Sequence, residues 1–173
     1  MKISAEHFFP GINPDEFARL WDDPEVFERV LRGIPGYKER EILEQTHDDD
    51  YMRRKIKYTI DRQIPRFARR LIKPHMLSWT EETVYNKKER VYRARFIPQY
   101  FSDQVGAGAT IKLQEEGRGG TRRISEGTIQ VKIPGLGRLA ERFVVKTAEE
   151  IAEIEYRLTR KEVEEYIKNR GQG

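Results

Sequence analysis

The sequence contains few of the side chains that commonly carry nucleophilic or metal chemistry. It has no cysteine, which excludes thiolate zinc sites, disulfides and cysteine nucleophiles. Its histidines, His7, His47 and His75, lie far apart, and none has a second histidine or a carboxylate at a recognised metal-ligand spacing. No serine stands in the Gly-x-Ser-x-Gly pattern of a hydrolase nucleophile. We therefore predict no catalytic residue, no metal site and no cofactor from local motifs.

Two other motifs have ordinary structural explanations. Asp48-Asp49-Asp50 follows His47 and can attract a cation weakly, but it lacks the twelve-residue loop of an EF-hand, so we interpret it as a solvated turn. The glycine-rich segments 106–108 and 117–120 do not lead from a parallel strand into a helix, which a phosphate-binding loop requires. They are typical of turns or strand bends.

Two arginines lie in stretches that alternate as strands do. Arg54 is expected to share a face with Ile56, and Arg123 to share one with Ser125. An arginine buried without a partner is costly, so an inward arginine is expected to meet a carboxylate or the anionic head of a ligand. In the alternative, both arginines lie in water near the strand ends. The candidate carboxylate partners are Glu81, Glu126 and Glu141.

Length and composition indicate one domain that covers residues 1–173. A chain of 173 residues can bury enough apolar surface to fold without disulfides, and the absence of cysteine favours a reducing, cytoplasmic setting. The first residues resemble neither a signal peptide nor a transit peptide. No apolar run approaches the roughly 20 residues that span a bilayer.

The net charge of +4 conceals a strongly basic middle of the chain. Residues 1–50 contain 6 Lys/Arg and 13 Asp/Glu, whereas residues 51–95 contain 14 and 4. Within the basic part, segment 62–73 has the composition of a short interfacial anchor, with Phe67 and Leu71 four residues apart among cations. We expect it to form a basic entrance or membrane patch; the alternative is a basic loop that packs a sheet edge. The patch comprises Arg66, Phe67, Arg69, Arg70, Leu71 and Lys73.

Periodicity predicts one strand, two short helices, six strands and one long helix. Residues 1–9 alternate as an edge strand does, and Asn13-Pro14 and Asp23-Pro24 are helix starts, the second helix ending at Gly33. Hairpin-length turns then separate the strands, so the sheet is expected to be antiparallel. The helix runs from about residue 139, and residues 168–173 are expected to fray. The six strands are expected at 37–46, 51–61, 76–86, 90–97, 107–115 and 121–133.

The expected fold is α+β, a curved antiparallel sheet of about seven strands that grips the apolar side of the long C-terminal helix, with two short helices after the first strand. This order resembles the START-like helix-grip superfamily (SRPBCC, the polyketide cyclase and lipid-transport clan) over essentially the whole chain. The most specific stretch is 119–145, GGTRRISEGTIQVKIPGLGRLAERFVV, which is similar to the last strand, turn and helix entry of that family. Segment 64–73, IPRFARRLIK, followed by Trp79, resembles a bacterial subfamily of unassigned function.

The resemblance implies an elongated cavity between sheet and helix that holds a lipid or another apolar molecule. The alternative is that the same residues fill a dry core. The ligand-cavity positions expected on the sheet are Ile56, Tyr58, Ile60, Trp79, Tyr92, Phe96, Ile111, Ile129 and Val131. Those expected on the helix are Phe143, Thr147 and Ile151.

Three functions remain open at this stage. The first is binding or transport of a hydrophobic small molecule or lipid in the cavity. The second is a cyclase or dehydratase in which Tyr58, Tyr92 or Glu81 moves a proton. The third is binding of an anionic partner through the basic segment 51–95, with a membrane surface favoured over nucleic acid.

Overall fold

The computed structural model describes residues 1–172, and within them the chain forms three α-helices and one seven-stranded antiparallel sheet. The predicted order of strand, two short helices, six strands and long helix is confirmed. A single 3-10 turn, Pro74–Met76, precedes the fourth strand. The elements are β1 (Lys2–Phe9), α1 (Pro14–Trp21), α2 (Pro24–Arg32), β2 (Tyr37–His47), β3 (Tyr51–Ile60), β4 (Ser78–Asn86), β5 (Val91–Pro98), β6 (Val105–Glu116), β7 (Gly120–Val131) and α3 (Gly137–Arg170).

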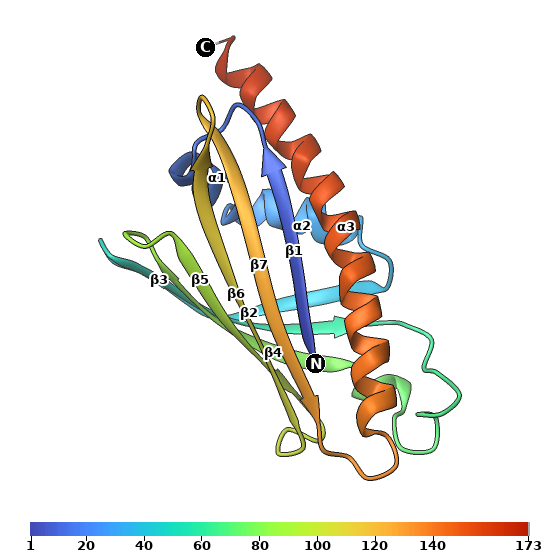
Figure 1. Ribbon diagram of the computed structural model, residues 1–173. Helices are drawn as coiled ribbons and strands as arrows, with labels where there is room; N and C mark the ends of the chain where they lie inside the picture. Colours follow the sequence, from blue (N-terminus) through green and yellow to red (C-terminus); the bar gives the residue numbers. More distant parts are fainter. Residues whose placement is uncertain (173) are drawn as a thin grey trace.

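The strands follow the order β1-β7-β6-β5-β4-β3-β2, so that β1 and β2 are the two edges of the sheet. Each strand from β2 to β7 pairs with the next one in the sequence, and β1 pairs with β7 in a register that places Lys2 opposite Thr128. The sheet is strongly bent, and α3 lies along its concave side beside β1 and β7 (Figure 1). The predicted helix-grip arrangement is therefore confirmed.

The two short helices begin where the sequence predicts. The side chain of Asn13 accepts hydrogen bonds from the backbone N–H groups of Asp15 and Glu16 at 3.1 and 2.9 Å. Asp23 caps α2 in the same way, and a proline occupies the first turn of each helix. Such caps satisfy backbone donors that have no partner inside the helix, so these boundaries depend on local sequence alone.

The long helix α3 contains 34 residues and is therefore about 50 Å long. It follows a turn in which Gly135 adopts a positive φ of 77°. At its other end the Arg170 guanidinium donates to Glu16 and to the backbone oxygen of Gly11. Lys168–Arg170 are thus helical instead of frayed, and Gly173 lies outside the described residues. No helix among residues 1–172 is both long and apolar enough to cross a membrane.

Many of the buried apolar side chains form two separate clusters at opposite ends of the concave side, and others, such as Ile56 and Tyr58, belong to neither. The first joins α1, the sheet and the C-terminal half of α3, and the second lies where β7 ends and α3 begins. The first contains Phe9, Ile12, Phe17, Ala18, Trp21, Met52, Tyr85, Tyr92, Leu113 and Val163. The second contains Ala68, Ile129, Val131, Ile133 and Leu136.

The basic segment between β3 and β4 forms turns and no α-helix. Its sequence is compatible with either a short helix or a turn, and the structure shows the turn. Ala68 is buried in the second cluster, where Ile64 and Ile72 pack beside it. The ring of Phe67 lies edge-on to Phe143 of α3, with the ring centroids 6.4 Å apart. The segment therefore covers the end of the sheet at the start of α3.

Candidate functional site

The predicted sheet positions of the cavity all lie on the concave face. They share strand parity with residues of the two core clusters, such as Met52 on β3, Tyr85 on β4 and Leu113 on β6. On α3, Thr147 and Ile151 are half-buried, whereas Phe143 is 40% exposed and touches Phe67. Of the sheet positions, Ile56, Tyr58, Tyr92, Ile129 and Val131 are buried, and Ile60, Trp79, Phe96 and Ile111 are half-buried.

A band of small residues crosses the concave face between the two core clusters. Ala94 on β5 stands opposite Ala109 on β6, which stands opposite Gly127 on β7. None of the three is fully buried. Along α3 the first fully buried residue is Thr159, so that the earlier turns of the helix bury no side chain completely. The band and the first half of α3 are therefore only partly buried.

A first group of buried polar side chains, the Arg54 cluster, lies beside this band. Arg54 on β3 is buried, and its guanidinium lies 3.3 Å from the carboxylate of Asp22, which follows α1. A second carboxylate, Glu81 on β4, lies 4.0 Å from the guanidinium and accepts a hydrogen bond from Thr83 at 2.6 Å. Tyr92 on β5 donates to Asp22 at 3.0 Å. One cation therefore holds two carboxylates on the concave face.

The electrostatics of this cluster favour neutral side chains. Burial raises the pKa of Asp22, and the opposing effects of Arg54 and Tyr92 do not cancel that increase. Burial also raises the pKa of Tyr92 well above its usual value. A carboxyl group with a raised pKa that accepts a phenol hydrogen bond has the chemistry to take up and return a proton.

A second group, the Arg123 cluster, joins β1, β7, α1 and α3. Arg123 on β7 makes two parallel hydrogen bonds to Glu155 on α3, at 2.9 and 2.5 Å. Trp21 and Thr159 donate to the same carboxylate at 3.2 and 2.6 Å. Burial acts to raise the pKa of Glu155, but these partners, chiefly Arg123, outweigh it, and the pKa is lowered. This pairing fixes the C-terminal half of α3 to the sheet.

The tautomer of His7 follows from its two neighbours. Its Nδ1 atom lies 3.2 Å from an Arg123 nitrogen, and its Nε2 atom lies 2.9 Å from Glu153. Arginine can only donate, so Nδ1 accepts and the proton sits on Nε2, from which it is donated to Glu153. The ring also stacks on Tyr156 at 4.3 Å. His7 is therefore a neutral structural link between the sheet and α3.

These contacts decide between the two interpretations of the inward arginines. Both arginines are buried, so the alternative that placed them in water is wrong. Glu81 is a partner of Arg54, as expected, but Arg123 pairs with Glu155 and with neither Glu126 nor Glu141. The Nε atoms of both arginines have no hydrogen-bond partner among residues 1–172.

Sequence reasoning missed Asp22, Glu155 and His7 as inward polar residues. Asp22 stands beside the N-cap residue Asp23 and looks like part of the same helix start. Glu155 lies in a helix with many glutamates, and only its offset of four residues from the buried Thr159 marks it as inward. The alternation of β1 was ambiguous between His7 and Phe8, and the structure buries His7.

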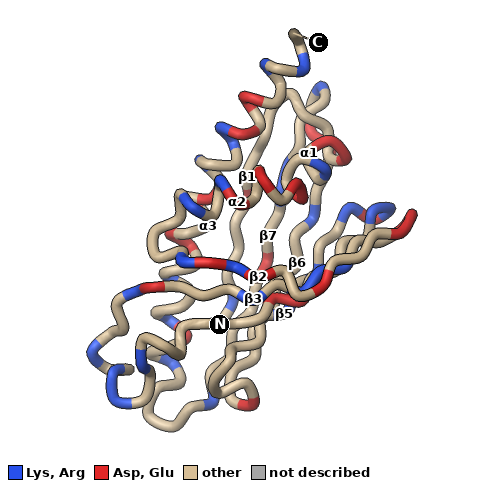
Figure 2. Tube along the Cα trace, turned by 180° about the vertical axis from the view of Figure 1, so that it is seen from behind, with Lys and Arg blue, Asp and Glu red and all other residues tan. Residues whose placement is uncertain are grey.

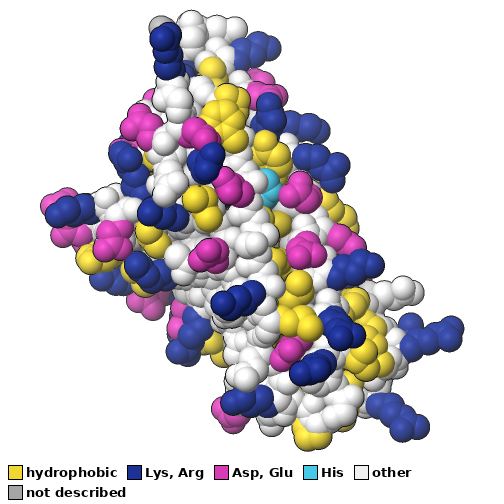
Figure 3. Space-filling view, viewed as in Figure 1, with side chains coloured by type: hydrophobic (Ala, Val, Ile, Leu, Met, Phe, Trp, Pro, Cys, Tyr) yellow, Lys and Arg dark blue, Asp and Glu magenta, His cyan; other side chains and the backbone are white. Residues whose placement is uncertain are grey.

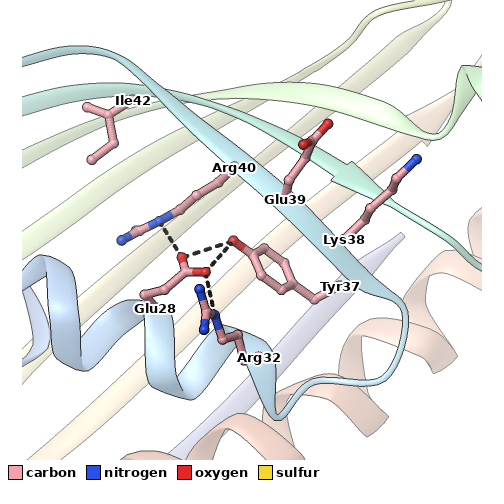
Figure 4. A pocket seen from close by; sticks show the side chains of 7 residues that line it. All are labelled: Glu28, Arg32, Tyr37, Lys38, Glu39, Arg40 and Ile42. Atoms are coloured by element: carbon pink, nitrogen blue, oxygen red, sulfur yellow. Dashed lines mark hydrogen bonds and ion pairs between the residues drawn. The ribbon is translucent and has the colours of Figure 1, made fainter.

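A recess of about 670 Å³ lies between α2 and β2, at the β2 edge of the concave face (Figure 4). Glu28 stands at its centre and is bound by Arg32 and Arg40 at 3.0 and 3.1 Å. Tyr37 donates to the same carboxylate at 3.0 Å, and burial together with this bond raises its pKa to about 12. These four side chains bind one another, and Lys38 and Glu39 also line the recess.

A second recess of about 670 Å³ lies on the sheet, and the residues around it include Ala94, Ala109 and Gly127 of the band together with side chains of the face turned away from α3. Examples are Lys2, Arg93 and Glu126. No group of three or more potential metal ligands is present among the described residues. The histidines remain apart: His47 contacts Gln45, and His75 packs near Tyr100.

Comparison with solved structures shows the helix-grip fold over nearly the whole chain. A protein from Thermus thermophilus, TTHA0849, has a TM-score of 0.67 at 19% identity, covering 94% of this chain and 97% of its own. The Zhui aromatase/cyclase from Streptomyces sp. R1128 has a TM-score of 0.62 at 16% identity, covering 95% and 94%. A START superfamily protein from Mycobacterium smegmatis has a TM-score of 0.59 at 16% identity, covering 95% and 98%.

The chain thus has the SRPBCC helix-grip fold predicted from its sequence. A search of curated proteins finds none that matches the sequence. A family model described as a protein of unknown function, DUF2505, matches residues 5–162. This chain is therefore a member of the DUF2505 family, with the helix-grip fold.

Proposed function

We propose that the protein binds an apolar small molecule or lipid between the concave face of the sheet and α3. The observation that supports this most directly is the division of the core into two clusters, with small, incompletely buried residues between them. Ligand sites are typically concave and mostly apolar, with a few polar groups that set orientation. The predicted cavity positions on the sheet share the concave face, and we propose that those outside the two clusters, such as Ile56 and Tyr58, supply apolar walls.

The Arg54 cluster supplies the polar end of such a site. The Arg54 side chain is 7% exposed, and its Nε–H has no partner among the described residues. Glu81 lies between Ile56 and Phe96 on the neighbouring strands, so apolar side chains flank it on both sides. A ligand with one carbonyl or carboxylate oxygen would accept from Nε and place its apolar part along the Ala94–Ala109–Gly127 band.

Native mass spectrometry of protein purified without organic solvent tests this proposal. We expect the spectrum to show the chain with a bound adduct, and this added mass to disappear after solvent extraction and refolding. We then expect a fluorescent fatty-acid probe to bind the emptied chain saturably, with one site per chain. The matched control is the same probe with unfolded protein in urea. Recovery of an empty chain together with the absence of saturable probe binding would contradict the proposal.

Catalysis of a proton transfer is the second candidate, and the raised pKa of Asp22 beside Tyr92 favours it. One similar structure is an aromatase/cyclase by title, and cyclisation followed by loss of water needs a group that takes and returns a proton. Molecules extracted from the protein would be incubated with excess wild-type chain and with a Tyr92→Phe variant. If the extracted molecule loses water with the wild-type chain and not with the variant, the result supports an enzyme. If the molecule is unchanged in both reactions, the enzymatic hypothesis is rejected.

A further inference from the structure

The cations of the basic segment 51–95 fall into two groups that the sequence does not separate. Most of those on the strands are paired, for example Arg53 with Asp48 at 3.2 Å and Lys55 with Glu82 at 3.0 Å. Those on the loop between β3 and β4 make no ion pair with any residue of the described chain, and they gather along that loop (Figure 2). These loop cations are Arg66, Arg69, Arg70 and Lys73.

The first turns of α3 continue this unpaired positive charge. Arg138 and Arg142 have no acidic partner within residues 1–172. Glu141 is the one acidic residue between positions 134 and 148, and it turns toward the sheet. There it accepts a hydrogen bond from the Val131 N–H at 2.9 Å and lies 4.0 Å from the N-terminal amine. The outer side of this end of α3 therefore carries positive charge without compensation.

Apolar side chains are exposed among these cations. Phe67 and Leu71 on the loop are 38% and 43% exposed, and Leu139 and Phe143 on α3 are 51% and 40% exposed. The contact between the Phe67 and Phe143 rings joins the two segments into one surface. Figure 3 shows apolar surface between Lys and Arg side chains at the lower right, where Figure 1 places the loop and the start of α3. Single exposed apolar residues are ordinary, whereas a group surrounded by like charges indicates an interaction surface.

We propose that this surface, the loop patch, docks onto a membrane that contains anionic lipids. The loop patch consists of Phe67, Leu71, Leu139 and Phe143 with the unpaired arginines and lysine around them. Its apolar side chains enter the headgroup region while the cations bind lipid phosphates. The charge of the patch selects an anionic surface. Its exposed phenylalanines and leucines select an apolar layer beneath that charge, which nucleic acid does not offer in its phosphate backbone.

Flotation of the full chain with vesicles tests this inference directly. Phosphatidylcholine vesicles with about one-third phosphatidylglycerol are compared with pure phosphatidylcholine vesicles at about 0.1 M and 0.5 M salt. We expect the chain to float with the anionic vesicles at low salt, and to be released at high salt or without the anionic lipid. The double variant Arg66→Gln with Arg70→Gln is expected to partition onto anionic vesicles roughly 25-fold more weakly, since each surface cation contributes about fivefold to the partition constant.

Two further variants make the result specific. Phe67→Ser is expected to weaken binding to anionic vesicles at both salt concentrations, because it removes an apolar contact that salt does not screen. The matched charge control is Arg19→Gln with Arg118→Gln, which removes two exposed and unpaired cations at the opposite end of the molecule and should bind as the wild type does. Absence of binding to anionic vesicles, equal losses in the control, or binding to a DNA duplex with no binding to vesicles would each overturn the inference. The assay needs no internal ligand, so its outcome is independent of the proposed cavity.

Discussion

Replacing Ala109 with leucine distinguishes an open interior from a filled one. Ala109 stands on the concave face between Ala94 and Gly127, and the Ile3 side chain of β1 packs against Gly127. Leucine adds three carbon atoms at this position. If the space in front of Ala109 is open, their burial is worth about 0.8 kcal/mol each, or about 2 kcal/mol in total. If the space is already filled, overpacking costs about 1–3 kcal/mol.

Urea unfolding measures the sign of this effect. With an m-value of about 2 kcal/mol/M, we expect Ala109→Leu to raise the midpoint by about 1 M and to leave m unchanged. Binding of the fatty-acid probe should be lost in the same variant, because the new side chain occupies the space that the ligand needs.

Ala18→Leu is the matched control for this change. Ala18 on α1 is 4% exposed and belongs to the first core cluster, where neighbouring side chains surround it. We expect the same chemical change there to destabilise the fold by about 1–3 kcal/mol. If Ala109→Leu lowers the midpoint as much as Ala18→Leu does, the interior is packed at both sites and the reasoning fails.

The remaining predictions concern the Arg123 cluster. Arg123→Met leaves Glu155 buried without its cation and is expected to lower the free energy of unfolding by about 3–5 kcal/mol. The double variant Arg123→Met with Glu155→Leu leaves no buried charge and should lower it much less. A single variant whose free energy of unfolding in urea titrations is within about 1 kcal/mol of the wild type would contradict this. Because the pKa of Glu155 is lowered in the folded chain, its stabilising effect is complete above the ordinary glutamate range near pH 4.3 and is lost as the pH falls through the folded pKa. Glu155→Gln should therefore remove part of the acid-side decrease of the urea midpoint, and an unchanged acid limb would show that other carboxylates cause that decrease.

Local signals in the sequence were enough to predict the order of elements. Asn13-Pro14 and Asp23-Pro24 begin helices because the capping side chain and the proline act within one turn. Strand alternation also placed Ile56, Tyr92 and the other sheet positions on one face, since side chains in a strand alternate whatever the tertiary structure.

Partners that are distant in the sequence could not be predicted in this way. The carboxylates that meet Arg54 and Arg123 come from positions 22 and 155, on elements whose approach depends on the bend of the sheet. The separation of paired strand cations from unpaired loop cations has the same origin, since Lys55 finds Glu82 only across two neighbouring strands. Alternation in the sequence indicates on which face of the sheet a side chain lies. Which residues it contacts on that face depends on strand pairing and on the docking of the helices.

The two halves of α3 are held to the sheet by different kinds of contact. Thr159 and Val163 and the Arg123–Glu155 pair anchor its C-terminal half, while the turns before Thr159 bury no side chain fully. Its first turns are held instead by Glu141, which accepts from the Val131 N–H at 2.9 Å, and by the contact between the Phe143 and Phe67 rings. The loop patch therefore lies at the less buried end of α3, so a surface that binds the patch contacts the part of the helix that has no fully buried side chain.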